Sequence, residues 1–195
     1  MKKAFLLLLL IATGTQAQRY EILSGDMKKL EGITDYNITF DYKGMTVHGY
    51  ATEEEYLADK MKKREKHEGK AEKFKEDWFA NRENLYEPAF INYFNGVFKK
   101  GEVKVGKNPE AKYTMEVKTT WVYPGYDAGT DTEQAKISAI VTVRETANPT
   151  NVLVSIAFDK SIGLSHQIGN SLGDRISWAY ERIAKNFTIQ LKRYL

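Results

Sequence analysis

Apolar and polar residues alternate most regularly in the second half of the chain. From Tyr113 to Tyr123, one set of alternate positions is mainly apolar and aromatic, and the positions between them are mainly polar. A period of two is typical of a strand with one buried face, and it places Trp121 and Tyr123 on the buried side. Similar runs occupy 137–143 and 152–158. Together the three runs predict an antiparallel meander.

An earlier run, Asn37 to Tyr42, alternates in the same way and predicts another half-buried strand. Lys43-Gly44 then forms a turn signal, after which the alternation resumes at Met45. The sequence leaves two readings open here, a bent strand or a hairpin.

Helical signals fill the region between these strands. Thr52 precedes three glutamates, and its hydroxyl can accept the backbone N–H of Glu55, so a helix is expected from there to about His67. A second helical stretch follows, in which Pro88 either kinks the helix or opens the next one. Its apolar stripe comprises Phe74, Trp78, Leu85, Phe90, Phe94, Val97 and Phe98.

A last helix is predicted near the end of the chain. Apolar residues recur there at spacings of three and four, and Ser171 with Asp174 is a plausible start. The preceding segment contains Gly163, Gly169 and Gly173, but their spacing matches no nucleotide-binding motif, so a mobile loop is expected. The expected fold class is α+β, with helices packed on one face of a mainly antiparallel sheet.

The first residues follow a different pattern. Lys2 and Lys3 precede an apolar stretch from Ala4 to Ala12, and small residues follow up to Ala17. This order predicts a secretory signal peptide, residues 1–17, cleaved near Ala17-Gln18. The apolar stretch is too short for a stable membrane span. The expected product is one α+β domain, residues 18–195, in the periplasm or secreted.

Composition narrows the classes of function. The chain has no cysteine, which excludes a lipoprotein anchor, disulfides and thiolate chemistry. Removing the signal peptide lowers the formal net charge from +3 to +1, which argues against a nucleic-acid partner. The three histidines, His48, His67 and His166, fall in different segments with no metal-ligand spacing. We therefore expect no enzyme activity, no metal and no cofactor.

Three stretches of the sequence support a resemblance. They are Lys112–Trp121 with the Tyr-Pro-Gly-Tyr motif that ends at Tyr126, Val143–Pro149 and Asp77–Arg82. Together they resemble a family of uncharacterised secreted proteins of Gram-negative gut and oral bacteria, and this resemblance transfers no activity. The order of elements is also similar to the amino-terminal domain of the Tol-Pal translocation protein and to the curli-secretion lipoprotein. That second likeness is one of architecture and transfers no residues.

The polar segment after Tyr123 contains the candidate binding residues Tyr126, Asp127 and Asp131. An aromatic ring at a loop tip beside carboxylates suits recognition of a protein or a glycan. Asp127 and Asp131 with Glu133 could also surround Ca²⁺, but the spacing lacks the EF-hand pattern, and a solvated hairpin loop is favoured.

These observations predict an exported, non-enzymatic envelope protein that binds another protein or an envelope component of unknown identity. The alternative is a periplasmic protein that binds a small molecule or a glycan.

Overall fold

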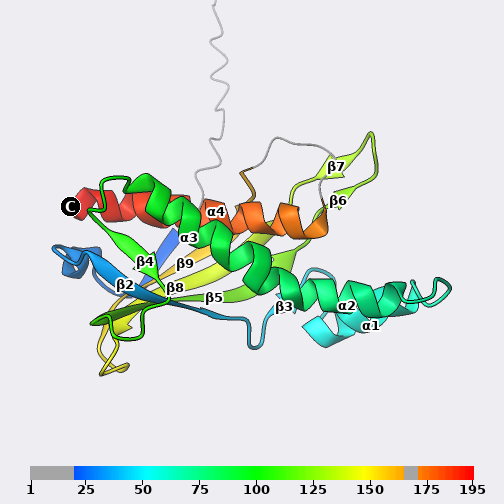
Figure 1. Ribbon diagram of the computed structural model, residues 1–195, viewed down its shortest axis with the longest axis horizontal. Coiled ribbons are helices and arrows are strands. Elements are labelled where there is room, and N and C mark those ends of the chain that lie inside the picture. The colour runs from blue at the N-terminus through cyan, green and yellow to red at the C-terminus, as the bar shows by residue number, and fades with distance from the viewer. Residues whose placement is uncertain (1–19, 165–170) are drawn as a thin grey trace, which may run out of the picture.

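The computed structural model describes residues 20–164 and 171–195, which form an α+β fold (Figure 1). The strands are β1 (Tyr20–Gly25), β2 (Asp35–Asp41), β3 (Thr46–Val47), β4 (Lys104–Gly106), β5 (Tyr113–Tyr123), β6 (Tyr126–Asp127), β7 (Thr132–Glu133), β8 (Lys136–Glu145) and β9 (Val152–Ile162). The helices are α1 (Glu53–Lys62), α2 (Lys70–Asn81), α3 (Glu87–Val97) and α4 (Leu172–Leu191). Shorter turns are η1 (Met27–Leu30), η2 (Arg82–Tyr86) and η3 (Lys192–Tyr194).

The main sheet has the strand order β1-β9-β8-β5-β2-β4 and is mostly antiparallel. β5, β8 and β9 form the predicted meander, and β1 adds an antiparallel edge that the sequence did not predict. β2 instead runs parallel to both β5 and β4. β3 also pairs with β5, further along the same side, so β2 and β3 form a bent strand and the hairpin reading is wrong.

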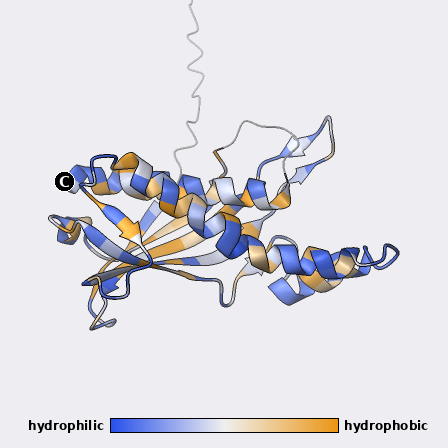
Figure 2. Cartoon of the chain, in the orientation of Figure 1, coloured by the Kyte–Doolittle hydropathy of each residue, from blue (hydrophilic) through white to orange (hydrophobic). Residues whose placement is uncertain are grey.

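Helices α3 and α4 pack against each other and cover one face of the sheet (Figure 1). The strand residues that alternate toward them are fully buried, as Met115, Val141 and Ile156 illustrate. Phe94 of α3 and Phe187 of α4 meet above this face, with ring centroids 6.3 Å apart. Figure 2 shows the corresponding concentration of hydrophobic residues between sheet and helices. The predicted α+β class, with helices on one sheet face, is confirmed.

A single helical run continues from α2 through η2 into α3. The backbone N–H of Glu87 bonds to the carbonyl of Arg82, five residues back, so η2 is a π turn. Pro88, which has no backbone N–H to donate, comes directly after the π turn, in the first turn of α3. The wider π turn lets the helix continue past this proline.

Helices α1 and α2 form a hydrophilic pair that extends beyond the sheet (Figures 1 and 2). Thr52 caps α1 as predicted, accepting the N–H of Glu55 at 3.1 Å. The helix ends at Lys62, short of the expected His67. The Glu53 carboxylate accepts hydrogen bonds from Trp78 and Arg82, which ties the start of α1 to the end of α2.

The start of α4 is also as predicted. Ser171 and Asp174 form a reciprocal capping box, in which each side chain bonds to the other's backbone N–H. Within the described residues, no helix is both long and apolar enough to cross a bilayer.

Candidate functional site

Two β-bulges lie side by side near one end of the sheet. On β5, the register against β8 shifts between Thr119 and Trp121, so Thr120 is an extra residue. On β9, the register shifts opposite Ser138 of β8, leaving one extra residue in the pair Asp159-Lys160. Both irregularities are thus level with Ser138. Bulges redirect side chains and are common beside functional sites.

The β5 bulge reverses which residues face the helices. Thr119 is buried, and its hydroxyl lies 2.5 Å from the Tyr180 hydroxyl of α4. Beyond Thr120, Val122 takes the helix-facing position and is 2% exposed. Trp121 and Tyr123 therefore lie on the opposite face, half-buried. The expectation that these two rings belong to the core is wrong, because one inserted residue inverts a period of two.

Trp121, Tyr123 and His48 form an aromatic cluster on this helix-free face. The Trp121 and Tyr123 rings lie within 17° of parallel, with centroids 6.4 Å apart. His48, which is exposed, packs edge-on against both, at 5.7 Å from Trp121 and 5.0 Å from Tyr123. The backbone N–H of His48 bonds to the Val122 carbonyl at 2.8 Å, which fixes its position beside β5.

Charged side chains border the tyrosine end of this cluster. The Tyr123 hydroxyl donates to Glu133 at 2.6 Å, and Lys136 also bonds to Glu133 at 2.6 Å while lying over the Tyr123 ring. Desolvation, followed by the hydrogen bond to Glu133, raises the pKa of Tyr123 to about 12. The hydrogen bonds from Lys136 and Tyr123 lower the pKa of Glu133. Glu133 is therefore a carboxylate and Tyr123 a neutral donor at neutral pH.

The tryptophan end is bordered by the β9 bulge. Lys160 Nζ lies 5.8 Å from the Trp121 ring centroid. Lys160 has a φ of 44°, which is uncommon for a residue other than glycine and is found most often at functional or strained sites. Ser138 holds this conformation, because its hydroxyl donates to Asp159 at 2.8 Å and accepts the Lys160 backbone N–H at 3.0 Å.

We call this region the bulge surface. It comprises His48, Trp121, Tyr123, Glu133, Lys136, Ser138, Asp159, Lys160 and Ile162. Ile162 pairs with Lys136 across β8 and β9 and is 41% exposed, so it adds an apolar side chain to the edge of the aromatic cluster. Sequence alternation alone could not find this surface, because Thr120 occupies a position that suits an uninterrupted strand.

The three predicted binding residues lie in the hairpin that continues from the bulge surface. β6 and β7 pair there, with Tyr126 opposite Glu133. The Tyr126 hydroxyl donates to Asp131 at 2.8 Å, and this bond raises the pKa of Tyr126. Asp127 accepts the backbone N–H of Gly129 at 3.0 Å. The structure therefore brings Tyr126 and Asp131 together, whereas Asp127 stabilises the turn; their role in binding stays a prediction.

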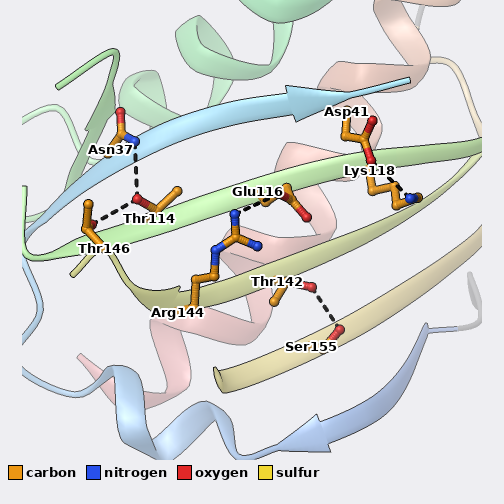
Figure 3. A network of polar contacts seen from close by, with 9 residues as sticks. All are labelled: Asn37, Asp41, Thr114, Glu116, Lys118, Thr142, Arg144, Thr146 and Ser155. Atoms are coloured by element: carbon orange, nitrogen blue, oxygen red, sulfur yellow. Dashed lines mark hydrogen bonds and ion pairs between the residues drawn. The ribbon is translucent and has the colours of Figure 1, made fainter. Parts of the chain in front are cut away.

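Elsewhere on the helix-free face, many polar side chains pair with one another (Figure 3), and Ile140 and Ala157 lie between them and the bulge surface. Glu116 pairs with Arg144 at 2.9 Å, and Asp41 with Lys118 at 3.0 Å. The remaining contacts in Figure 3 link Asn37 to Thr114, Thr114 to Thr146, and Thr142 to Ser155. Exposed aromatic surface on this face is thus concentrated at the bulge surface.

A cavity of about 330 Å³ lies between α2 and the start of α4, lined by Phe74, Asp77, Trp78, Asn81 and Ser171–Gly173. The capping box already occupies N–H groups at this end of α4. Gly173 is there for close packing, since a Cβ on it would lie 2.6 Å from Asn81 Nδ2. Gly163 also packs closely, 3.2 Å from Trp178 Cβ, while Gly169 lies outside the described residues. These contacts do not form a phosphate site.

The three histidines lie in different segments of the chain, as the sequence indicates. His67 is exposed between α1 and α2, far along the chain from His48, and His166 lies outside the described residues. Across residues 20–164 and 171–195, no cluster of three acidic or histidine side chains could hold a metal ion. The signal-peptide prediction falls on residues outside this range and stays a prediction.

Comparison with known proteins gives little further information. No protein-family profile and no curated protein sequence matches the chain. Among solved structures, the chain is similar to the PelC dodecamer from Paraburkholderia phytofirmans, with a TM-score of 0.37 and 12% identity over 89% of this chain and 97% of that one. A similarity at this level supports no inference about function. The resemblances stated from the sequence stay predictions.

Proposed function

We propose that this chain is an exported, non-enzymatic binding protein and that the bulge surface is where it contacts another protein or an envelope component. One observation carries the proposal. The β5 bulge at Thr120 turns Trp121 and Tyr123 out of the core and onto the face that α3 and α4 leave uncovered, and the β9 bulge places Lys160 beside Trp121. A strand that simply buried one face would place both rings inside.

The cost of this arrangement supports a role in binding. Exposing part of a tryptophan and a tyrosine forgoes burial of a large apolar area, and Lys160 has an unfavourable backbone conformation. Aromatic residues are also the side chains that most often dominate binding free energy. Tyr126, which is 39% exposed, extends the same aromatic surface along the β6–β7 hairpin.

The bulge surface suits binding better than catalysis. The Glu133 carboxylate already accepts hydrogen bonds from Tyr123 and Lys136. The Ser138 hydroxyl already donates to the Asp159 carboxylate. His48 makes ring contacts with Trp121 and Tyr123 instead of orienting a nucleophile. These groups form a stable, partly apolar contact area.

The proposal is tested by photo-crosslinking in the cells that produce the protein. A photoreactive amino acid replaces His48, at the centre of the bulge surface, and in a second strain replaces Lys104, on β4 at the far edge of the sheet. We expect a discrete adduct from position 48 and none from position 104. Adding Trp121→Ala to the position-48 strain should remove the adduct.

Two results would contradict the proposal. Equal labelling from both positions would mean that the contact is nonspecific. An adduct at position 48 that survives Trp121→Ala would mean that the aromatic cluster is not the contact area.

A further inference from the structure

We propose that the ligand of the bulge surface is an acidic glycan, with a sugar ring on the Trp121–Tyr123 cluster and its carboxylate on the ammonium group of Lys160. This inference rests on the proposed function, since it assigns a ligand chemistry to the same surface. The charge, the hydrogen-bonding groups and the size of the bulge surface support an acidic glycan.

Lys160 supplies the cation for an anionic ligand, because Lys136 is already paired with Glu133. The Asp159 carboxylate, which precedes Lys160 in β9, accepts the Ser138 hydroxyl. Among the described residues, no carboxylate lies within salt-bridge distance of Lys160 Nζ, whereas Lys118, Lys136 and Arg144 on the same face each have one. Its ammonium instead lies over the Trp121 ring. An anionic group placed here would contact the cation and the edge of the ring together. The position therefore favours a ligand with both an apolar face and a negative charge.

The hydrogen-bonding groups around the rings favour a hydroxyl-rich ligand. The Glu133 and Asp159 carboxylates keep lone pairs free to accept, and the ammonium groups of Lys136 and Lys160 keep N–H groups free to donate, whereas Ser138 already donates its only hydroxyl proton to Asp159. Sugar hydroxyls both donate and accept, while the C–H face of a sugar ring packs on an aromatic ring. Bonds to Ser138 hold the Asp159 side chain and the Lys160 backbone in place before binding, which lowers the entropy lost when a ligand binds.

The size of the surface also favours a glycan over a folded protein. A stable protein interface buries about 800 Å² on each partner. Beyond the bulge surface, the helix-free face carries Ile140 and Ala157 and then paired charges such as Glu116–Arg144, so the aromatic side chains do not continue along the sheet (Figure 3). A ligand a few sugar rings long fits an aromatic area of this extent.

Calorimetric titration of the purified chain tests the proposal. The probes are oligomers of galacturonate and of mannuronate, neutral galactose and mannose oligomers of the same length, and a poly-glutamate peptide. We expect at least one uronate oligomer to bind more tightly than its neutral counterpart, and binding to weaken as salt is raised. Trp121→Ala should weaken binding by about 30-fold or more, as expected for a central aromatic contact.

Lys160→Gln is the second variant, and its exposed position makes misfolding a small concern. It should weaken uronate binding by roughly tenfold and leave the neutral oligomers unaffected. The matched controls are Phe79→Ala, an exposed ring on α2, and Lys104→Gln, an exposed cation on β4, both of which should bind as the unchanged protein does. Circular dichroism and melting temperature verify the fold of each variant.

Several outcomes would overturn the glycan assignment. These are equal binding of acidic and neutral oligomers, binding unchanged in both Trp121→Ala and Lys160→Gln, or binding of poly-glutamate with no uronate bound. If no probe binds while the Trp121-dependent adduct at position 48 still forms, the glycan assignment fails and the proposed function stands. If that adduct is also absent, both fail.

Discussion

At the scale of the residue, Thr120 determines which side chains of β5 lie on the surface. It adds one position to β5 opposite β8, and every later side chain of that strand changes face. The bulge cannot be predicted from the residue type, because threonine is common in regular strands and Thr120 occupies a polar position of the alternation. The identity of Trp121 and Tyr123 as surface residues therefore depends on strand register, which is set by the pairing of β5 with β8.

The contact between Tyr123 and Glu133 gives a prediction at this scale. Glu133→Gln should lower the pKa of Tyr123 from about 12 toward the ordinary tyrosine value of 10.0, because it removes the negative charge that favours the neutral phenol. Carbon NMR of the tyrosine rings across alkaline pH measures the change. Glu116→Gln, on the same face but paired with Arg144, is the control and should leave the Tyr123 pKa unchanged.

The same shift has a consequence for stability. Because the pKa of Tyr123 is raised in the folded state, its stabilising contribution is complete below pH 10 and is lost as the pH rises from about 10 to about 12. Tyr123→Phe should therefore reduce the alkaline loss of stability in that range. An unchanged Tyr123 pKa in Glu133→Gln would contradict the hydrogen bond described here.

At the scale of the element, local signals in the sequence located the four helices and the long strands β2, β5, β8 and β9, but not β1, β4, β6 or β7. The caps at Thr52 and Ser171 gave the helix starts, because side-chain capping depends on residues within one turn. The meander was found from period-two alternation. The parallel pairing of β2 with β5 and β4 was not, since it depends on contacts between segments about 70 residues apart. β1 was missed because all six of its residues are exposed and show no buried face.

The candidate site was likewise predicted where it depends on local sequence and missed where it depends on contacts between distant segments. The sequence located the segment with Tyr126 and Asp131, which the structure places together in the hairpin beside the bulge surface. It could not find His48 and Lys160 as neighbours of Trp121, because they come from different strands and loops. Contacts between side chains from distant segments can be identified only once the fold is known.

Helix packing at the start of α4 gives a prediction at the element scale. Gly173→Ala should lower the free energy of unfolding by about 1–3 kcal/mol, because its Cβ would lie 2.6 Å from Asn81 Nδ2 and 2.8 Å from Leu85 Cδ1. Chemical denaturation measures this change. Gly96→Ala, in α3 with no atom within 4 Å of the added Cβ, should instead stabilise by about 0.5–1 kcal/mol. Equal effects at the two glycines would contradict the close packing of α4 on η2.

At the scale of the whole molecule, the two faces of the sheet differ in composition. One face is sealed by α3 and α4 and supplies the hydrophobic core, which must hold a chain without disulfides. The other is polar and charge-paired over most of its area and aromatic at the bulge surface (Figure 3). Substitutions at the proposed contact area should therefore leave the hydrophobic core unchanged.

We predict that the chain is exported and cleaved before Gln18. Mass spectrometry of the protein isolated from its producing cells should find Gln18 at the amino terminus, because the order of charged, apolar and small residues before it predicts a cleaved signal peptide. Cell fractionation should place that product outside the cytoplasm. Recovery of the chain from the cytosol with Met1 to Ala17 still attached would contradict an envelope role.

The binding role of the bulge surface is tested most directly by the indole N–H resonances of the three tryptophans, Trp78, Trp121 and Trp178. Trp78 is buried and bonded to Glu53, and Trp178 lies on α4, so both serve as internal controls. When soluble envelope extract is added to the labelled protein, we predict that the Trp121 resonance shifts or broadens while the other two stay in place. An unchanged Trp121 resonance, or equal changes in all three, would contradict the account.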